Sequence, residues 1–188
     1  PLLLASGSPR RRQLLSLLVD DFEVLATDVD ETPIAGESPS DMVARLASAK
    51  ARAASQLRPQ ATVIGSDTTV ALDGVAIGKP VDDDDARRTL GLLSGRVHLV
   101  HTAVAVVSQG AGTAVEVSTT EVAFAPLGEA EIEWYVGTGE PRGKAGAYAI
   151  QGAGGALVER VDGDPSTVVG LPLRLTRTML VRSGWLRT

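Results

Sequence analysis

Short apolar runs alternate with segments of helical periodicity from the start of the chain. Residues 2–5 form a continuous apolar run, which is typical of a buried strand. Ser8 and Pro9 then match an N-cap and a first helical residue, and leucines recur on one side of the helix that they predict. Residues 22–26 predict a second strand, and residues 27–38, with a proline and a glycine, predict an ordered loop.

The same alternation continues through the middle of the chain. Ser38 and Pro39 repeat the cap and proline signal, and the apolar spacing predicts a helix to about residue 56. A buried strand is predicted at residues 62–64, ending at a Gly-Ser-Asp turn. A hairpin then follows around Asp73-Gly74, with strands at 68–72 and 75–77.

The second half of the chain continues this order of helices and strands. The expected elements are a helix from the acidic run 82–85 to near 95, strands at 97–108 and 113–125 around a hairpin at 110–112, a helix at 129–136, a glycine-rich loop at 137–146, strands at 147–151 and 156–161, and a helix from 172. No repeat or linker interrupts them. The pattern therefore predicts a single α/β domain over residues 1–188, with a mixed β-sheet flanked by helices.

Composition narrows the possible partners. Hydrophobic residues make up 44% of the 188 residues, which is ordinary for a folded domain, and aromatic residues make up only 3%. The net charge is −5, which argues against a protein that coats nucleic acid polymers. Any polyanion that the chain binds is expected to be small and to be held by a local basic cluster.

Composition also limits the choice of metal and of compartment. The chain has no cysteine and only two histidines, so a bound cation is expected to be Mg²⁺ or Mn²⁺ held by carboxylates. No apolar run approaches the length of a membrane span, and residues 1–8 lack the features of a signal peptide. We therefore expect a cytoplasmic protein that does not bind membranes.

The first candidate site is Ser6-Gly7-Ser8-Pro9 followed by Arg10, Arg11 and Arg12. A strand ends here and a helix begins, so free backbone amides and guanidinium groups could together hold a phosphate. A capped helix with solvated arginines explains the same residues. Lys50 lies seven residues after Val43 and four after Leu46, so it is expected on the same side of the helix as these two residues. From there its side chain reaches either solvent or a polar cleft.

Two further segments carry polar side chains beside apolar runs. Asp67 follows the strand predicted at 62–64, where α/β sheets place their sites, and a turn carboxylate is the ordinary alternative. Lys79, in Gly78-Lys79-Pro80, could add a cation. The loop with Lys144 and the segment at Gln151 lack the glycine spacing of a P-loop or a dinucleotide site. His98 and His101 point to opposite faces of a strand, and we expect structural roles for both.

One motif favours a different chemistry. Asp28-Val29-Asp30-Glu31-Thr32 fits D-x-D-x-T, the nucleophile motif of haloacid-dehalogenase-type phosphatases, in which Asp28 would form an aspartyl-phosphate. An acidic loop explains the same residues.

Seven blocks of the sequence occur in a fixed order over nearly the whole chain. They are LASGSPRR (4–11), LASAKA (46–51), GSDT (65–68), IGKP (77–80), TGEP (138–141), GKAGAY (143–148) and QG (151–152). Together they closely resemble the Maf family of nucleoside triphosphate pyrophosphatases. The resemblance implies an elongated mixed α/β fold with a cleft between two lobes, a homodimer, and metal-dependent hydrolysis of a nucleoside triphosphate to a monophosphate and pyrophosphate.

The resemblance also implies roles for individual residues. Asp67 matches the catalytic aspartate, and Glu31 matches an acidic position near the metal, for which Asp30 is the alternative. The phosphate-contacting positions match Ser6, Arg11, Lys50 and Lys79. Positions that separate a dTTP/UTP branch from a 7-methyl-GTP branch match Arg10, Thr68 and Gln151. Asp67 could accept a proton from water or hold the metal that acidifies it.

Base recognition is expected to use hydrogen bonds. Gln151 offers a donor and an acceptor, and the Thr68 hydroxyl can serve as either, which suits the edge of uracil or thymine. A phosphatase that uses Asp28, and a module that binds a triphosphate without cleaving it, remain the alternatives.

Overall fold

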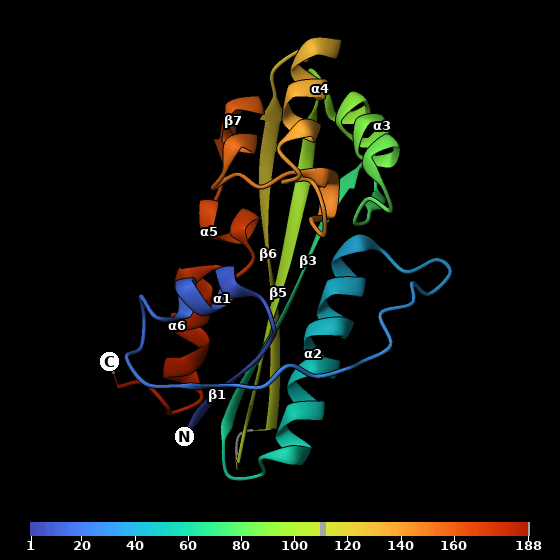
Figure 1. Ribbon diagram of the computed structural model, residues 1–188. Coiled ribbons are helices and arrows are strands. Elements are labelled where there is room, and N and C mark those ends of the chain that lie inside the picture. Colours follow the sequence, from blue (N-terminus) through green and yellow to red (C-terminus); the bar gives the residue numbers. More distant parts are fainter. Residues whose placement is uncertain (110–111, 188) are drawn as a thin grey trace.

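Three long strands form the spine of the molecule. They are β3 (Thr62–Leu72), β5 (Val97–Ser108) and β6 (Gly112–Phe124), and they run through both halves of the elongated molecule in Figure 1. The computed structural model describes residues 1–109 and 112–187. Within them one sheet has the order β2-β1-β3-β5-β6-β7, with β4 also paired to β3; the short strands are β1 (Leu2–Ala5), β2 (Glu23–Val24), β4 (Val75–Ile77) and β7 (Val158–Asp162).

The sheet is mixed, as the sequence predicts. β1 pairs in parallel with β2 and β3, and every other pairing among the described strands is antiparallel. The described helices are α1 (Pro9–Leu15), α2 (Pro39–Leu57), α3 (Asp83–Leu93), α4 (Glu129–Gly137), α5 (Pro165–Val169) and α6 (Leu173–Arg182). None of these helices is both long enough and apolar enough to cross a membrane.

The predicted helix starts are confirmed. The side chain of Ser8 accepts the amide of Arg11 at the start of α1, and Ser38 caps α2 through the amide of Asp41. A proline follows each of these caps at the first helical position. The local signals therefore fix where the two helices begin.

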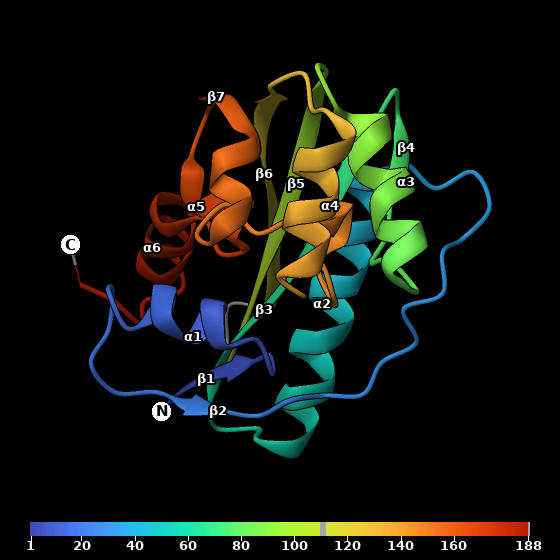
Figure 2. The same ribbon diagram turned by 45° about the horizontal axis from the view of Figure 1, so that its top comes forward.

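The hydrophobic core has separate parts in the two halves of the sheet. In one half, α3, α4 and the segment after residue 145 pack over Val70 and Val100. In the other half, α1 and α6 cover one face around Ile64, and α2 covers the opposite face around Val63. Figures 1 and 2 show these two groups of helices at opposite ends of the long strands. This is the two-lobed α/β architecture that the resemblance implies.

Several predicted elements differ in extent. The strands predicted at 62–64 and 68–72 are one continuous strand, because residues 63–71 of β3 pair with β5 without a break. Asp67 is therefore in the middle of a strand, and its expected place at a strand end is wrong. The strand predicted at 22–26 has only the two residues of β2. The hairpin predicted at 110–112 includes residues 110 and 111, which lie outside the described residues.

The strand predicted at 147–151 is also wrong. This segment follows a short 3₁₀ turn at Ala145–Ala147, and a second one covers Ala153–Leu157. Gly146 and Ala147 both have positive φ, and the carbonyl of Ala149 accepts the amide of Gly152. The backbone of this segment therefore forms its hydrogen bonds outside the sheet, within the segment and with the hydroxyl of Tyr135. The short helix α5 was not predicted.

Both histidines are held in the structure by hydroxyl groups. His98 is 1% exposed, packs edge-on against Phe124 and Tyr148, and has Nε2 2.9 Å from the Tyr148 hydroxyl. His101 Nδ1 lies 2.8 Å from the hydroxyl of Thr119. Burial lowers the pKa of His98 to about 4. These contacts agree with the structural roles expected for both residues.

The buried, neutral side chain of His98 is expected to make the free energy of unfolding depend on pH. The unfolded chain binds a proton below its ordinary pKa of about 6.5, whereas the folded chain does not until about pH 4. Stability should therefore fall as the pH drops through this window, by roughly 2 kcal/mol between pH 7 and pH 5. Urea unfolding at both pH values should show that His98→Gln removes this share of the loss. Equal losses in the two proteins would contradict the prediction.

Candidate active site

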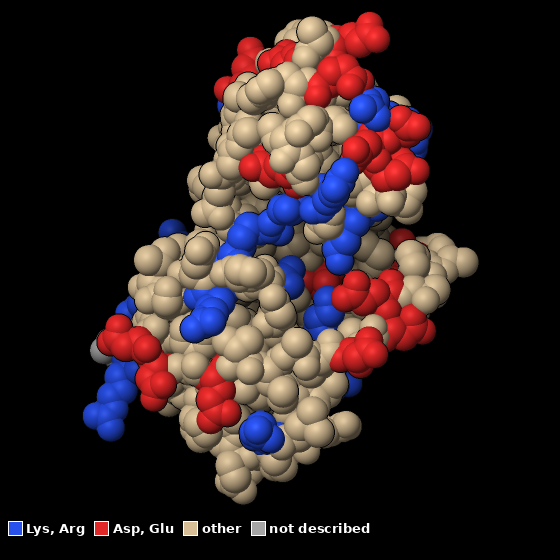
Figure 3. Space-filling view, in the orientation of Figure 1, with Lys and Arg blue, Asp and Glu red and all other residues tan. Residues whose placement is uncertain are grey.

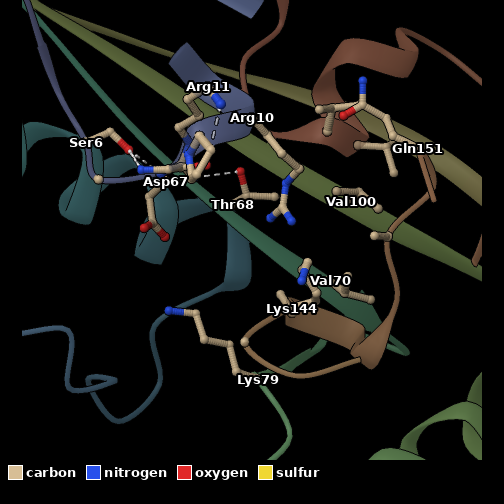
Figure 4. A pocket seen from close by; sticks show the side chains of 18 of the residues that line it. Ser6, Arg10, Arg11, Asp67, Thr68, Val70, Lys79, Val100, Lys144 and Gln151 are labelled. Atoms are coloured by element: carbon tan, nitrogen blue, oxygen red, sulfur yellow. Dashed lines mark hydrogen bonds between the residues drawn. The ribbon is translucent and has the colours of Figure 1, made fainter. Parts of the chain in front are cut away.

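A cavity of about 470 Å³ lies between the two lobes. Figure 3 shows a hollow at the middle of the molecule, crossed by a band of Lys and Arg side chains, and Figure 4 shows its interior. The cavity is lined by every residue that the sequence proposes for the site: Ser6, Arg10, Arg11, Glu31, Lys50, Asp67, Thr68, Lys79 and Gln151.

An interruption in strand pairing explains why the cavity lies here. On one edge of β3, β1 pairs as far as Ala5 and Gly65. β4 takes over only at Ile77 and Val70. Residues 66–69 are thus left without a strand partner on that edge among the described residues.

The open edge gives one cavity access to both faces of the sheet. Successive side chains of a strand point to opposite faces, so Asp67 faces α2 while Thr68 faces α1 and α5. Both residues line the same cavity. A ligand can contact both side chains only because this edge of β3 is unpaired, so that the ligand can extend around it.

On the α2 side, one lysine joins two carboxylates. Lys50 Nζ lies 2.6 Å from an oxygen of Asp67 and 2.6 Å from an oxygen of Glu31. Lys50 and Asp67 are each 9% exposed, whereas half of the Glu31 side chain is exposed. The hydrogen bond from Lys50 is the main reason why the pKa of Glu31 is lowered. Lys50 therefore reaches the polar cleft and not bulk solvent.

The same two carboxylates could hold a divalent cation. Their oxygens converge on one point, because both contact a single nitrogen atom. Within residues 1–109 and 112–187, no three His, Asp or Glu side chains are grouped to form a complete protein cage. Mg²⁺ commonly binds through one or two carboxylates together with phosphate oxygens and water. Asp67 and Glu31 therefore fit a cation whose remaining ligands would be water and the phosphate oxygens of a bound ligand.

On the α1 side, Arg11 is held in a fixed orientation. Its Nε donates to the carbonyl of Gly170 at 2.8 Å, and its Nη2 donates to the Thr68 hydroxyl at 3.1 Å. A longer bond of 3.4 Å reaches Ser6 Oγ, which also accepts the amide of Ser8. Burial lowers the pKa of Arg11, and Asp67 partly opposes this effect. These three bonds leave other guanidinium hydrogens for a ligand. Figure 4 shows Arg11 beside Thr68.

A chain of hydroxyl groups behind Arg11 fixes the direction of its hydrogen bonds. Thr102 Oγ1 donates to the carbonyl of Thr167 at 2.7 Å. Its single hydrogen is then used, so it must accept from Thr68 Oγ1, 2.9 Å away. Thr68 in turn offers Arg11 only a lone pair. The expectation that Thr68 could donate to a base is therefore wrong in this arrangement, because its hydrogen points to Thr102.

Four cations around the cavity have no carboxylate partner. Within the described residues, no Asp or Glu oxygen lies within 4 Å of Arg10, Arg11, Lys79 or Lys144. The two arginines enter from one side of the cavity and the two lysines from the other (Figure 4). With Lys50, five cations face two carboxylates in a chain whose net charge is −5. The cavity is therefore suited to a small polyanion.

Lys144 also lines the cavity, although the sequence motifs do not indicate it as a site residue. Its Nζ donates to the carbonyls of Glu140 and Arg142, both at 3.2 Å. These bonds hold the ammonium group at the cavity wall. The available signal in the sequence is the pair of glycines near this lysine, Gly143 and Gly146.

The part of the cavity next to Gln151 is less polar. Figure 4 shows Val100 at the same end as Gln151, and Tyr148 and Ile150 come just before Gln151 in the chain. These three side chains line the cavity, as does Val70, which lies beside Lys144. The cavity thus combines a cationic part with an apolar part that ends at an amide. This combination matches a ligand that has a charged end and a flat, partly polar end.

The aspartate of the phosphatase alternative lies elsewhere. Asp28 is exposed in the loop after β2 and is not among the residues that line the cavity. Asp30, in the same motif, accepts the amide of Thr32, as in an ordinary turn. Of this motif, only Glu31 reaches the cavity.

Comparisons with known proteins match nearly the whole chain to one family and to named relatives. The family model described as Maf-like protein matches residues 1–183. A protein of Anaeromyxobacter dehalogenans named dTTP/UTP pyrophosphatase is 54% identical over 187 residues, covering 98% of this chain and 94% of that protein. One of Myxococcus xanthus with the same name is 50% identical over 183 residues, covering 97% and 92%.

A solved structure supports the fold alone. The HAM1 protein from Coxiella burnetii aligns with a TM-score of 0.56 and 18% identity, covering 96% of this chain and 98% of that chain. At this identity the two proteins share an architecture, and the similarity says nothing of their ligands.

Proposed function

This chain belongs to the Maf family, and we propose that it hydrolyses nucleoside triphosphates, with dTTP and UTP preferred, to a nucleoside monophosphate and pyrophosphate. The observation that carries the proposal is the group of cations without carboxylate partners around one cavity, opposite Asp67 and Glu31. A triphosphate carries close to four negative charges, which this cluster could neutralise. The names of the relatives support the same reaction and the same bases.

The proposed reaction breaks the bond between the α-phosphorus and the bridging oxygen. Water attacks the α-phosphorus, its oxygen forms the new bond, and pyrophosphate leaves with the bridging oxygen. In this proposal Asp67 accepts the proton of that water, while Arg11 and Lys79 stabilise the charge that develops on the phosphates. The proposal is supported by the fact that all three side chains line the cavity. A cation held by Asp67 and Glu31 would supply further charge stabilisation.

Base choice is assigned to the apolar end of the cavity. Gln151 offers both an amide hydrogen and a carbonyl oxygen, which match the alternating groups of uracil and thymine. Thr68 contributes through Arg11, since its hydroxyl hydrogen points to Thr102. Arg10 lines the cavity from α1. We expect UTP and dTTP to exceed ATP and GTP in kcat/KM.

A product assay tests the proposal. The protein is incubated with UTP and Mg²⁺ or Mn²⁺, and the products are resolved by anion exchange. UMP and pyrophosphate are expected as first products. UDP and orthophosphate would contradict the proposal and favour the phosphatase alternative, and binding of UTP without turnover would favour a non-catalytic module.

Arg11 should depend on the hydroxyl chain behind it. Thr102→Val removes both the acceptor for Thr68 and the donor to Thr167, while it keeps the volume of the side chain. We expect kcat/KM for UTP to fall about tenfold, the effect of one hydrogen bond. Thr102→Ser should retain most activity, because serine keeps the hydroxyl. Equal activity in Thr102→Val and the wild type would contradict this role.

We also propose a homodimer in the cytoplasm that uses Mg²⁺ or Mn²⁺. The two-carboxylate arrangement at Lys50 supports the choice of metal. Sedimentation at several protein concentrations tests the dimer.

A further inference from the structure

A carboxylate just outside the cavity, that of Glu140, organises the segment that carries Gln151. Glu140 follows α4 and is half-buried. Its Oε2 accepts the amide of Gly154 at 2.8 Å, and its Oε1 accepts the amide of Ala153 at 3.1 Å. Burial raises the pKa of Glu140, but hydrogen bonds from Tyr135 and from these amides outweigh burial, so the pKa is lowered overall. Glu140 is thus an anionic acceptor at neutral pH.

Tyr135 extends the same hydrogen bonds to the other end of the segment. Its hydroxyl lies 2.7 Å from Glu140 Oε2 and accepts the amide of Ala149 at 3.0 Å. Since a carboxylate cannot donate, the tyrosine hydrogen must point to Glu140. The direction is therefore fixed from Ala149 to Tyr135 to Glu140. The ring of Tyr135 is 0% exposed in the core of its lobe, so the hydroxyl has a rigid support.

Two glycines allow this close approach. A Cβ at Gly152 would lie 1.7 Å from Glu140 Oε1, and a Cβ at Gly154 would lie 2.6 Å from the Tyr135 hydroxyl. A side chain at either glycine would therefore displace the acceptor next to it, which is the Glu140 carboxylate or the Tyr135 hydroxyl. The sequence of the segment is therefore fitted to Glu140 and Tyr135.

We infer that Glu140 and Tyr135 are positioning residues that set the base preference by fixing residues 149–154, at whose centre Gln151 lines the cavity. The inference rests on the proposed function, since it assigns Gln151 to the nucleobase. Neither side chain lines the cavity, so both act through the backbone that they hold. The side-chain amide of Gln151 can discriminate between bases only if its hydrogen bonds have a fixed direction. That direction is fixed only while the backbone of the segment is fixed.

Two variants test the inference with little change of shape. Glu140→Gln replaces one acceptor oxygen by an NH₂ group, which cannot accept the N–H or O–H groups that point at this position. Tyr135→Phe removes only the hydroxyl. The ratio of kcat/KM for UTP to that for ATP is measured for both variants, the wild type and Gln151→Ala. We expect about a tenfold loss of this ratio in each variant, with a smaller change in kcat for ATP.

Amide hydrogen exchange gives a readout that does not depend on catalysis. Both variants should lose protection at residues 149–154 while α4 and the strands keep theirs. Glu133→Gln is the matched control, because Glu133 lies on α4 and pairs only with half-buried Arg87 among the described residues. It should change neither readout.

The outcomes are separable. Unchanged protection in Glu140→Gln would overturn the inference, and so would lost protection with an unchanged UTP-to-ATP ratio. A uniform fall in activity with all nucleotides would also overturn it, because it would indicate a merely structural role. If the wild type released no pyrophosphate from UTP, the proposed function would fail, whereas the exchange data would still decide whether the two side chains fix the segment.

Discussion

Asp67→Asn is expected to lower kcat for UTP by about 10²- to 10⁴-fold, the usual loss when a general base is removed. Asparagine keeps the size of the side chain and can still accept the hydrogen bond from Lys50 Nζ. It cannot take a proton from water. Lys50 also keeps its contact with Glu31, so the buried ammonium group is not left without a carboxylate.

The measurement combines steady-state kinetics with a thermal melt of each protein. The folded state should be retained, and Asp28→Asn should match the wild type because Asp28 lies outside the cavity. An inactive Asp28→Asn with an active Asp67→Asn would place the chemistry in the loop after β2. Recovery of Asp67→Asn at high Mn²⁺ concentration would instead assign Asp67 to cation binding, since excess metal compensates for a weakened ligand.

Gly65→Ala is expected to destabilise the protein by about 1–3 kcal/mol, through overpacking between β3 and α2. An added Cβ would lie 2.3 Å from the backbone carbonyl of Ala47 and 2.9 Å from the Cβ of Ala51. A helix backbone cannot turn aside as a flexible side chain can, so α2 must shift. Because α2 carries Lys50 and β3 carries Asp67, the shift should also reduce activity in the protein that remains folded.

Urea unfolding checks this prediction. Gly91→Ala is the matched control, because a Cβ there meets nothing within 4 Å and the residue lies inside α3. Alanine is the better helix former by roughly 0.5–1 kcal/mol, so this control should be slightly more stable than the wild type. Equal stability of Gly65→Ala and the wild type would mean that α2 moves away at no cost.

Local sequence signals predict those features of the fold that depend on residues close together in the chain. The caps at Ser8 and Ser38 and the long strands β5 and β6 follow from short-range patterns, and the structure has them. The position of Asp67 could not be read in this way. Gly65 and Ser66 resemble a turn, yet pairing with β5 carries the strand through them, and this pairing depends on residues almost 40 positions later.

The resemblance to a family named the site residues, whereas periodicity alone did not bring them together. The contact of Lys50 with Asp67 and Glu31 joins a helix, a strand and a loop. The chain from Arg11 to Thr102 also depends on the direction of each hydroxyl hydrogen. The direction of each of these hydrogen bonds can be assigned only when the positions of all the donor and acceptor groups are known. A pattern of residue types in the sequence therefore cannot predict it.

The spine of long strands has a mechanical consequence for how substrate enters. Domains that close like a jaw turn on a few residues whose backbone torsions are free to change. Here β3 and β5 pass through both lobes and stay paired from Val63–Val107 to Ala71–Leu99, so their torsions are locked by the ladder across the whole cleft. A jaw motion would have to break or bend this ladder. Adjustment to substrate is therefore left to side chains and to the loops at the rim, and the spacing between the lobes is set when the sheet folds.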